Sequence, residues 1–335
     1  MKKYDVITFG RSSIDLYSQN IGAPFNDIQG FDAFVGGSPL NIAVACARLG
    51  LTARLLTAVG ADKVGEFIVS FLEKEKVNTR CIPIKKQSRS SAVILGIEPP
   101  DKFPLVYYRD NAADLQVSID DVLNARIQEH KILLINGTAL SREPSRSATF
   151  FAAEIAQKSK VRCVLDLDFR ADQWHDYRAF GITVRALLPK VEIAIGTEEE
   201  ILAATLDNAD QVHIVDQQIS APTITGDLNK SIQILLDSGV QTLVVKKGAQ
   251  GAALYTAGAA PVEVPGFPTK VVNVLGAGDA FAGGFLYGII QGWDAFKCCR
   301  MGNASGAQVV ARRGCANFMP TLDESMEFIK KNGGF

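Results

Sequence analysis

The sequence predicts an α/β fold in which a mainly parallel sheet is covered on both faces by helices and carries a small β-lid. From about residue 130 onward, continuous apolar runs alternate with helical patterns, as expected for buried parallel strands joined by helices. The chain has 335 residues, 47% of them hydrophobic, which suits one large domain spanning residues 1–335. Two segments, 11–35 and 88–112, break this rhythm, and we assign both to the lid.

The first 112 residues combine parts of the main sheet with the lid. A helix is expected from about Pro39 to Leu49, where apolar residues recur at helical spacing and Gly50 can end the helix. The other elements expected here are a strand at 4–10, a strand at 54–59, a helix at 62–75, and lid strands at 92–97 and 105–109 joined by a turn at 99–102.

The rest of the chain alternates regularly. Apolar strands bounded by helices require crossover connections, which place the strands in parallel. The strands are expected at 131–136, 162–167, 191–195 and 241–246, with helices near 143–158, 174–187, 197–205 and 227–238; short strands at 251–256 and 261–264 then precede helices at about 277–291, 294–312 and 321–331.

Composition argues against several classes of protein. The net charge is −1, from 35 basic and 36 acidic residues, so we expect neither a nucleic acid nor a membrane surface as partner. Six cysteines form no CxxC pair and three histidines lie far apart, which argues against a zinc site or a disulfide scaffold. The first residues lack the apolar stretch of a signal peptide, and we expect a cytoplasmic location.

The segment 271–285 carries the clearest chemical signal. An apolar strand end runs into Gly276, Ala277 and Gly278, and then into a helix rich in small residues. Backbone N–H groups at such a helix start can bind an anion, as phosphoryl transfer requires. Asp279 follows in the first turn, where its carboxylate could accept a proton from an alcohol. A tight turn with Asp279 only stabilising the helix would produce the same pattern, and this segment alone leaves both readings open.

Two motifs together resemble a known family. Gly276-Ala277-Gly278-Asp279-Ala280-Phe281, followed by Gly283-Gly284-Phe285, resembles the C-terminal signature of the PfkB carbohydrate kinases. The run 36–43, followed by Arg48-Leu49-Gly50, then 59–62 and Gly65, resembles their N-terminal signature. The resemblance covers essentially the whole chain. It implies a ribokinase-like three-layer α/β/α fold and a sugar kinase that uses ATP and Mg²⁺.

The resemblance implies roles for the acceptor site. Asp279 would take the proton from the acceptor hydroxyl, and the N–H groups of Gly276, Ala277 and Gly278 would form the anion hole. The sugar pocket would be lined by Gly36, Gly37 and Asn41, with Asp15 contacting sugar hydroxyls. Glycine suits this position because a polyol can approach bare backbone closely. Asn41 could instead be a polar residue at a helix start, and Asp15 a loop cap.

The resemblance also implies a nucleotide site. The run 245–252 is similar to the family's strand-turn-strand beside the phosphates, so Lys246, Gly248 and Gly251 would bind the nucleotide, together with Asn303. Glu200 would order water around Mg²⁺, in a Thr197-Glu198-Glu199-Glu200 version of the family's Asn-x-x-Glu motif. An acidic run at a helix start is also stabilising without metal. The chain has no Walker or GxGxxG sequence, so the P-loop and Rossmann readings lack their fingerprints.

One departure concerns a monovalent cation. Many relatives carry Asp-Thr where this chain has Asn273-Val274. The missing carboxylate puts in question the monovalent-cation site that some members have at this position.

The substrate is expected to be a sugar acid. The run Tyr107-Tyr108-Arg109 closes a lid strand and Arg170 follows a core strand, and we expect Tyr107, Arg109 and Arg170 to contact the substrate. Two converging arginines suit a carboxylate. Both resemble substrate-contacting arginines of 2-keto-3-deoxygluconate kinases, although each could be a surface ion pair, Arg109 with Asp110. The runs 10–17, 30–37, 96–104 and 109–114 more closely resemble the 5-dehydro-2-deoxygluconate kinases of myo-inositol catabolism.

Several functions therefore remain to be compared. The resemblance implies phosphorylation of the 6-hydroxyl of 5-dehydro-2-deoxy-D-gluconate, with a 2-keto-3-deoxygluconate kinase or another PfkB sugar kinase as the alternative. A non-catalytic sugar- or nucleotide-binding regulator is the alternative from a different class, and a dehydrogenase is a third. Because an unpaired sheet edge invites pairing, the lid is also a candidate surface for a homodimer.

Overall fold

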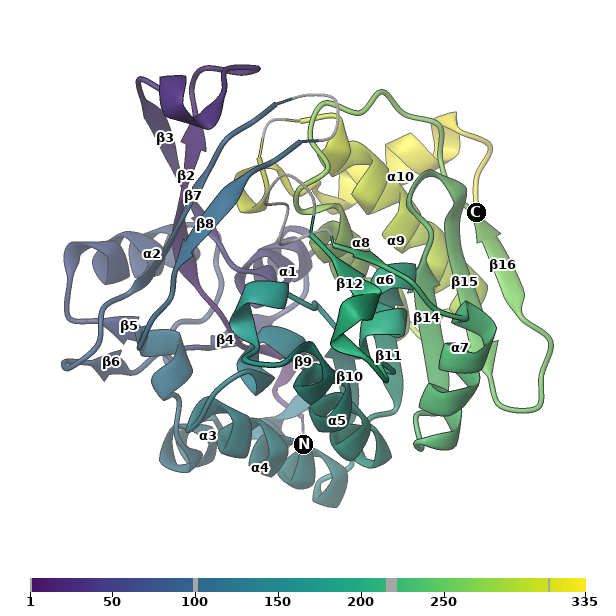
Figure 1. Ribbon diagram of the computed structural model, residues 1–335. Helices are drawn as coiled ribbons and strands as arrows, with labels where there is room; N and C mark the ends of the chain where they lie inside the picture. The colour runs from purple at the N-terminus through teal and green to yellow at the C-terminus, as the bar shows by residue number, and fades with distance from the viewer. Residues whose placement is uncertain (1, 99–101, 215–221, 313) are drawn as a thin grey trace.

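The computed structural model describes residues 2–98, 102–214, 222–312 and 314–335, which form a central sheet between two layers of helices (Figure 1). The pairs from β4 to β14 are parallel, and the pairs of β15 with β14 and β16 are antiparallel. The predicted mainly parallel sheet is thus confirmed. In spatial order its eight strands are β16 (Val262–Pro265), β15 (Gly251–Thr256), β14 (Thr242–Lys246), β11 (Ile193–Thr197), β10 (Arg162–Asp166), β9 (His130–Asn136), β1 (Tyr4–Phe9) and β4 (Ala53–Leu56).

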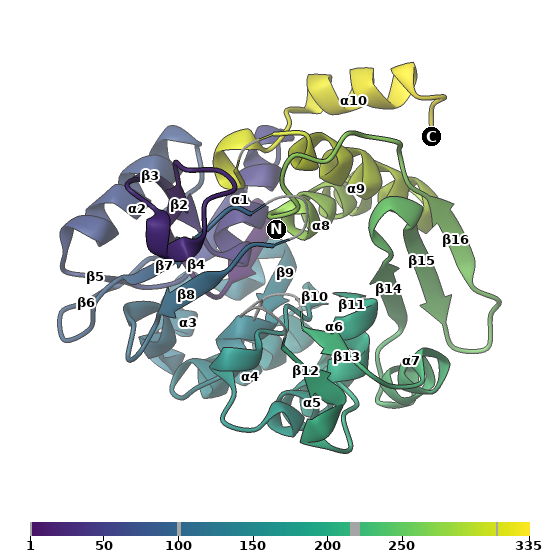
Figure 2. The ribbon, with the colours of Figure 1, turned by 45° about the horizontal axis from the view of Figure 1, so that its top comes forward.

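Helices cover both faces of this sheet, as Figure 2 shows. Along β9, Ile132 and Leu134 pack in one buried cluster and Leu133 and Ile135 in another, because successive strand residues point to opposite faces. The first cluster includes residues of α1 (Ser38–Arg48), α8 (Ala277–Ile290) and α9 (Ala295–Val310); the second includes residues of α3 (Ile119–Ala125), α4 (Ser145–Lys158), α5 (Tyr177–Leu187), α6 (Glu198–Ala203) and α7 (Leu228–Asp237).

A separate four-stranded sheet is formed by the two segments that the sequence analysis assigns to a lid. In spatial order its strands are β3 (Phe31–Gly36), β2 (Ser13–Ser18), β7 (Ser91–Leu95) and β8 (Leu105–Tyr108). The two central strands pair in parallel, and each outer strand pairs antiparallel with its neighbour. The turn expected at 99–102 falls largely outside the described residues.

Element ends differ from the sequence expectations where capping residues decide them. The helix expected at 174–187 begins at Tyr177, because the side chain of Asp176 accepts a hydrogen bond from the Arg178 N–H. The strand expected at 54–59 is split, and its second part, β5 (Val59–Gly60), pairs with β6 (Ile84–Lys85). The short helix α3, which starts with a Ser118–Asp121 capping box, was not predicted.

Further elements complete the fold. Helix α2 (Lys63–Lys74) starts at Asp62, whose side chain accepts a bond from the Gly65 N–H. Helix α10 (Leu322–Lys331) packs on α9, and β12 (Val212–His213) pairs with β13 (Thr223–Ile224). None of the helices in the described residues has the length and apolar character to cross a membrane.

Candidate active site

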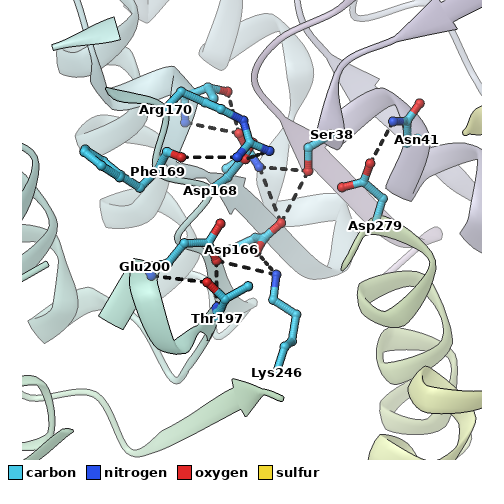
Figure 3. A network of polar contacts seen from close by, with 12 residues as sticks. Ser38, Asn41, Asp166, Asp168, Phe169, Arg170, Thr197, Glu200, Lys246 and Asp279 are labelled. Atoms are coloured by element: carbon cyan, nitrogen blue, oxygen red, sulfur yellow. Dashed lines mark hydrogen bonds and ion pairs between the residues drawn. The ribbon is translucent and has the colours of Figure 1, made fainter. Parts of the chain in front are cut away.

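Polar residues gather where the parallel strands end (Figure 3). β10 ends at Asp166 and β14 at Lys246, and β11, which ends at Thr197, lies between them. The start of α8 reaches the same region, since Asp279 is hydrogen bonded to Asn41 of α1 and interacts with Lys246. Ligand sites of open α/β sheets form at this carboxyl edge.

The turn before α8 is shaped by glycine. Gly276 is the N-cap of α8 with φ at 81°, in the left-handed region that favours glycine. The Ala277 N–H makes only a long bond of 3.4 Å to Val274 O, and no side chain caps the helix start. A Cβ on Gly278 would lie 3.1 Å from Lys246 Nζ, so an ammonium group stands beside this turn. Helix dipole, N–H groups and ammonium together favour an anion here.

Asp279 is held in the first turn of α8 by a neighbour from α1. Asn41 Nδ2 donates a hydrogen bond of 2.7 Å to Asp279 Oδ2. Burial raises the pKa of Asp279, whereas the nearby Ser38 hydroxyl and the Asn41 amide act to lower it. A raised pKa makes a carboxylate a stronger base, which suits proton abstraction from an alcohol. The Asn41 Oδ1 atom is buried and has no hydrogen-bond partner among the described residues, so it can receive a ligand hydroxyl.

Lys246 lies between two carboxylates. Its Nζ is 3.3 Å from Asp166 Oδ1 and 3.6 Å from Glu200 Oε2. Burial is the largest effect on Asp166 and raises its pKa to about 7, although Lys246 acts in the opposite direction. Glu200 Oε2 also accepts the Thr197 N–H at 2.8 Å, in a capping box that starts α6. The acidic run at 198–200 therefore has the helix-stabilising role that its position suggests.

Carboxylate oxygens of this kind suit Mg²⁺. Among the described residues no three metal-ligating side chains converge on one point. Asp166 and Glu200, which flank Lys246, are nevertheless hard oxygen donors that can contact Mg²⁺ through water. This donor set fits an ion that arrives with its own phosphate ligands.

The lid contributes two rows of side chains to a cavity of about 70 Å³. Strand register places Asp15, Val93 and Tyr107 in one row, and Tyr17, Leu95 and Leu105 in the next. All six line the cavity. From the rest of the molecule the lining includes Arg11, Gly37, Ser38, Asn41, Arg170, Leu275, Gly276, Asp279 and Cys315. Most of the predicted acceptor residues thus meet around one space, with Gly36 against the Asp15 carboxylate.

Arg109 does not line this cavity. Its guanidinium is buried and donates to Asp114 Oδ2 from Nε at 2.9 Å and from Nη2 at 2.6 Å, and further to Thr138 O and Gln173 Oε1. The predicted substrate contact does not fit this geometry, because a buried ion pair already uses the guanidinium. The partner is Asp114 and not the neighbouring Asp110, since the short 3-10 helix at 113–116 turns Asp114 inward.

The fold and these residues agree with what the comparisons found. The profile of the pfkB family carbohydrate kinases matches residues 3–322. This chain belongs to the pfkB family of carbohydrate kinases. Two curated relatives named 5-dehydro-2-deoxygluconokinase are similar to it over 98% of its length and 94% of theirs: that of Geobacillus thermodenitrificans is 34% identical over 332 residues, and that of Clostridium perfringens 32% over 331.

Solved pfkB-like structures share the fold. The fructokinase of Xylella fastidiosa with bound ATP has a TM-score of 0.83 and 26% identity, covering 99% of both chains. A ribokinase II candidate from E. coli, in complex with ATP and Mg²⁺, has a TM-score of 0.84 and 22% identity, covering 98% of this chain and 99% of that one.

The residues that the PfkB resemblance assigns to the nucleotide lie around β14, β15 and α9. Gly248 has φ at 57° with open space around it, and Gly251 has φ at 99° where a Cβ would meet Val264 O. Asn303 on α9 is buried, and its Nδ2 donates to Val264 O and Pro265 O. Its amide therefore ties α9 to β16, and a nucleotide could use only its remaining oxygen.

Sequence reasoning missed several residues of this PfkB site. Arg11 lines the cavity, and Ser38 Oγ donates to Asp166 Oδ2 at 3.3 Å. Asp168 adopts a φ of 38°, which is unusual for a residue other than glycine. Its Oδ1 lies 2.5 Å from Arg170 Nη2. The strand-end rule could have found Asp166 and Asp168, because both directly end or follow β10.

Proposed function

We propose that this chain phosphorylates 5-dehydro-2-deoxy-D-gluconate on its 6-hydroxyl group with ATP. One observation carries the proposal: Asp279, at the start of a helix with an open glycine turn, lines the same cavity as Arg170. Asp279 beside the glycine turn suits phosphoryl transfer to an alcohol, and Arg170 suits an acidic sugar. The curated relatives named 5-dehydro-2-deoxygluconokinase support this choice among sugar acids.

The chemistry assigned to the residues is a direct transfer. Asp279 accepts the proton of the acceptor hydroxyl. The oxygen of that hydroxyl forms a bond to the γ-phosphorus of ATP, and the bond from this phosphorus to the ADP oxygen breaks. The N–H groups of Gly276, Ala277 and Gly278 bind the oxygens of the moving phosphoryl group. The ammonium of Lys246, beside Gly278, adds positive charge at the same place.

The nucleotide is proposed to bind as MgATP beside β14 and β15, against Lys246, Gly248 and Gly251. The ion would be held mainly by the phosphates, with Glu200 and Asp166 ordering its water molecules, and it would neutralise phosphate charge. The E. coli neighbour in complex with ATP and Mg²⁺ supports this part. We leave a monovalent cation out of the proposal, since Asn273 is neutral and its Oδ1 already accepts the Leu275 N–H at 3.0 Å.

The acceptor is proposed to bind between the lid and α8. Asn41, Asp15 and Tyr107 would contact its hydroxyl groups over the backbone of Gly36 and Gly37, and Arg170 would bind its carboxylate. The alternative within the family is a 2-keto-3-deoxygluconate kinase, whose substrate also has a carboxylate that a cation such as Arg170 would bind.

A coupled assay of ATP consumption over a panel of sugars and sugar acids tests the substrate. We expect kcat/KM for 5-dehydro-2-deoxy-D-gluconate to exceed that for 2-keto-3-deoxygluconate and for neutral hexoses by at least about tenfold. A preference for 2-keto-3-deoxygluconate would select the alternative, and a preference for a neutral sugar would exclude both acids.

A second experiment separates a kinase from a non-catalytic binding protein. We expect Asp279→Asn to lower kcat by several orders of magnitude while sugar-acid binding, measured by calorimetry, is largely kept. Equal turnover by the two proteins would remove Asp279 from the mechanism. Tight nicotinamide binding in a fluorescence titration would favour a dehydrogenase instead.

We further propose a cytoplasmic location and a homodimer through the lid. The outer lid strands β3 and β8 have one paired edge each, and exposed apolar side chains lie on both, including Phe31, Val106 and Tyr108. Sedimentation of wild type against a Val106→Lys variant tests the dimer, because a charge on an edge strand opposes pairing.

A further inference from the structure

Arg11 is a buried arginine that has no carboxylate at ion-pair distance in the part of the chain that the structure describes. Only 7% of its surface is exposed. Among the residues that the structure describes, no carboxylate oxygen lies within 4.0 Å of its guanidinium, whereas Arg109 has Asp114 and Arg170 has Asp168 at such distances. Burying a cation is costly unless an anion compensates it, and here the compensating carboxylates, those of Asp15, Asp168 and Asp114, lie beyond ion-pair distance.

The direct contacts of Arg11 orient the guanidinium, and carboxylates act on its charge only from beyond ion-pair distance. Its Nη1 donates to Ser13 Oγ at 2.8 Å, and Ser13 Oγ in turn donates to Asp15 Oδ1 at 2.6 Å. Its Cζ lies 5.1 Å from the centre of the Tyr107 ring, a cation–π contact. The hydrogen-bonded link between Asp15 and Arg11 thus runs through a hydroxyl group, and the Asp15 charge acts on Arg11 from a longer distance. Four of the five N–H donors of the guanidinium have no hydrogen-bond partner among the described residues.

The cavity that Arg11 lines also contains Asp279 and Arg170. Phosphate would be bound at Gly276–Gly278 and Lys246, which belong to α8 and β14. Arg11, in contrast, contacts Ser13 and Tyr107 of the lid sheet. An anion at Arg11 therefore belongs to the acceptor and not to the nucleotide.

Resting on the kinase function proposed above, we infer that Arg11 binds the carboxylate of the sugar-acid substrate, next to Arg170 and in place of Arg109. A carboxylate can take two parallel N–H bonds from one guanidinium. Arg170 is paired with Asp168, whereas the guanidinium of Arg11 has no carboxylate within ion-pair distance among the described residues, so its remaining N–H donors can bind the ligand. Arg11 then sets specificity for acids over neutral sugars.

The test compares the sugar acid with its C1 carboxamide, which has the same shape without the charge. In wild type the acid has a KM about a hundredfold below that of the carboxamide. In Arg11→Met the KM for the acid rises by about a hundredfold, the KM for the carboxamide changes by less than about threefold, and kcat for both stays within about tenfold. Arg89→Met is the charge-matched control, an exposed arginine before β7, and both KM values stay at wild-type levels.

Each outcome separates the inference from the function beneath it. If wild type phosphorylates the acid and Arg11→Met raises the KM for the acid and for the carboxamide by the same factor, Arg11 only supports the lid and the inference is wrong. If wild type phosphorylates no sugar acid, the proposed function fails first, and the inference with it. Should Arg11→Met fail to fold, Arg11→Lys decides: a KM for the acid raised about tenfold with an unchanged carboxamide supports the inference, and two unchanged KM values overturn it.

Discussion

Asn41 donates a hydrogen bond of 2.7 Å to the Asp279 carboxylate and so joins the start of α1 to the start of α8. These residues are 238 positions apart in the chain, one in each of the two family motifs. The bond favours the ionised carboxylate, which is the form that a base requires.

Loss of this bond is expected to show in the pH profile. Asn41→Ala removes a donor that lowers the pKa of Asp279, so this pKa rises further and the base is protonated at a higher pH. The acidic limb of kcat/KM therefore moves to higher pH. At pH 7 we expect kcat/KM to fall by roughly tenfold to a hundredfold, the effect of a hydrogen bond to a charged group. If the acidic limb of the steady-state kcat/KM profile did not move in Asn41→Ala, Asp279 would not be the base that this limb reports.

Lys246 and Lys247 form a matched pair for a charge test. Lys246 Nζ points to Asp166 and Glu200, whereas the adjacent Lys247 is bonded to the exposed Glu263. We expect Lys246→Met to lower kcat by about 10²–10³-fold, because it removes positive charge beside the phosphoryl position. Lys247→Met should leave kcat within about twofold. Similar losses in both variants would indicate a general effect of charge.

The Arg109–Asp114 pair is expected to act on stability and not on catalysis. Both side chains are almost fully buried, so Arg109→Met leaves an uncompensated carboxylate and lowers the free energy of unfolding by about 3–5 kcal/mol. The double variant Arg109→Met/Asp114→Leu should recover most of this loss. Urea denaturation measures the free energy, and Arg178→Met, at an exposed ion pair, is the control with little change. A large rise in KM for the sugar acid with normal stability would restore Arg109 to the substrate site.

Asp166 is expected to make stability depend on pH. Its pKa is raised to about 7 in the folded protein, above its value of 3.8 when exposed, so the folded state binds a proton more readily than the unfolded chain between these values. The contribution of Asp166 to stability is therefore fully present below about pH 4 and is lost as the pH rises to about 7. Asp166→Asn should flatten the fall in urea midpoint between pH 5 and pH 7.5. An identical slope in both proteins would show that other groups cause it.

The fold was predictable where local patterns are strong. The alternation of apolar strands and helices predicted the order of elements in the central sheet. The family motifs predicted that Asn41 and Asp279 belong to one site. Helix ends were less predictable, since a single side chain such as that of Asp176 decides where α5 begins.

Charge partners were the part that sequence could not supply. Arg109 and Arg11 both lie near lid strands in the sequence, yet one is fully paired and the other has no carboxylate partner among the described residues. The difference comes from the turn that brings Asp114 under Arg109, and from the fold that places Ser13 between Arg11 and Asp15. These contacts join residues only two to five positions apart, so the sequence contains the possible partners but does not show which of them the local backbone turns toward each arginine.

The two rows of the lid make this sheet sensitive to small changes in length. Side chains alternate between the two faces of a strand, so inserting or deleting one residue at the start of β7, before Val93, would turn Val93 and Leu95 away from the cavity together. A change of two residues would restore the facing. The connection between Ser18 and Phe31 lies outside the paired strands, but it is anchored where Gln19 N–H donates to Gly30 O and Gly22 N–H donates to Ile97 O. Engineered lids for other acceptors should therefore change in length by even numbers of residues within the strands.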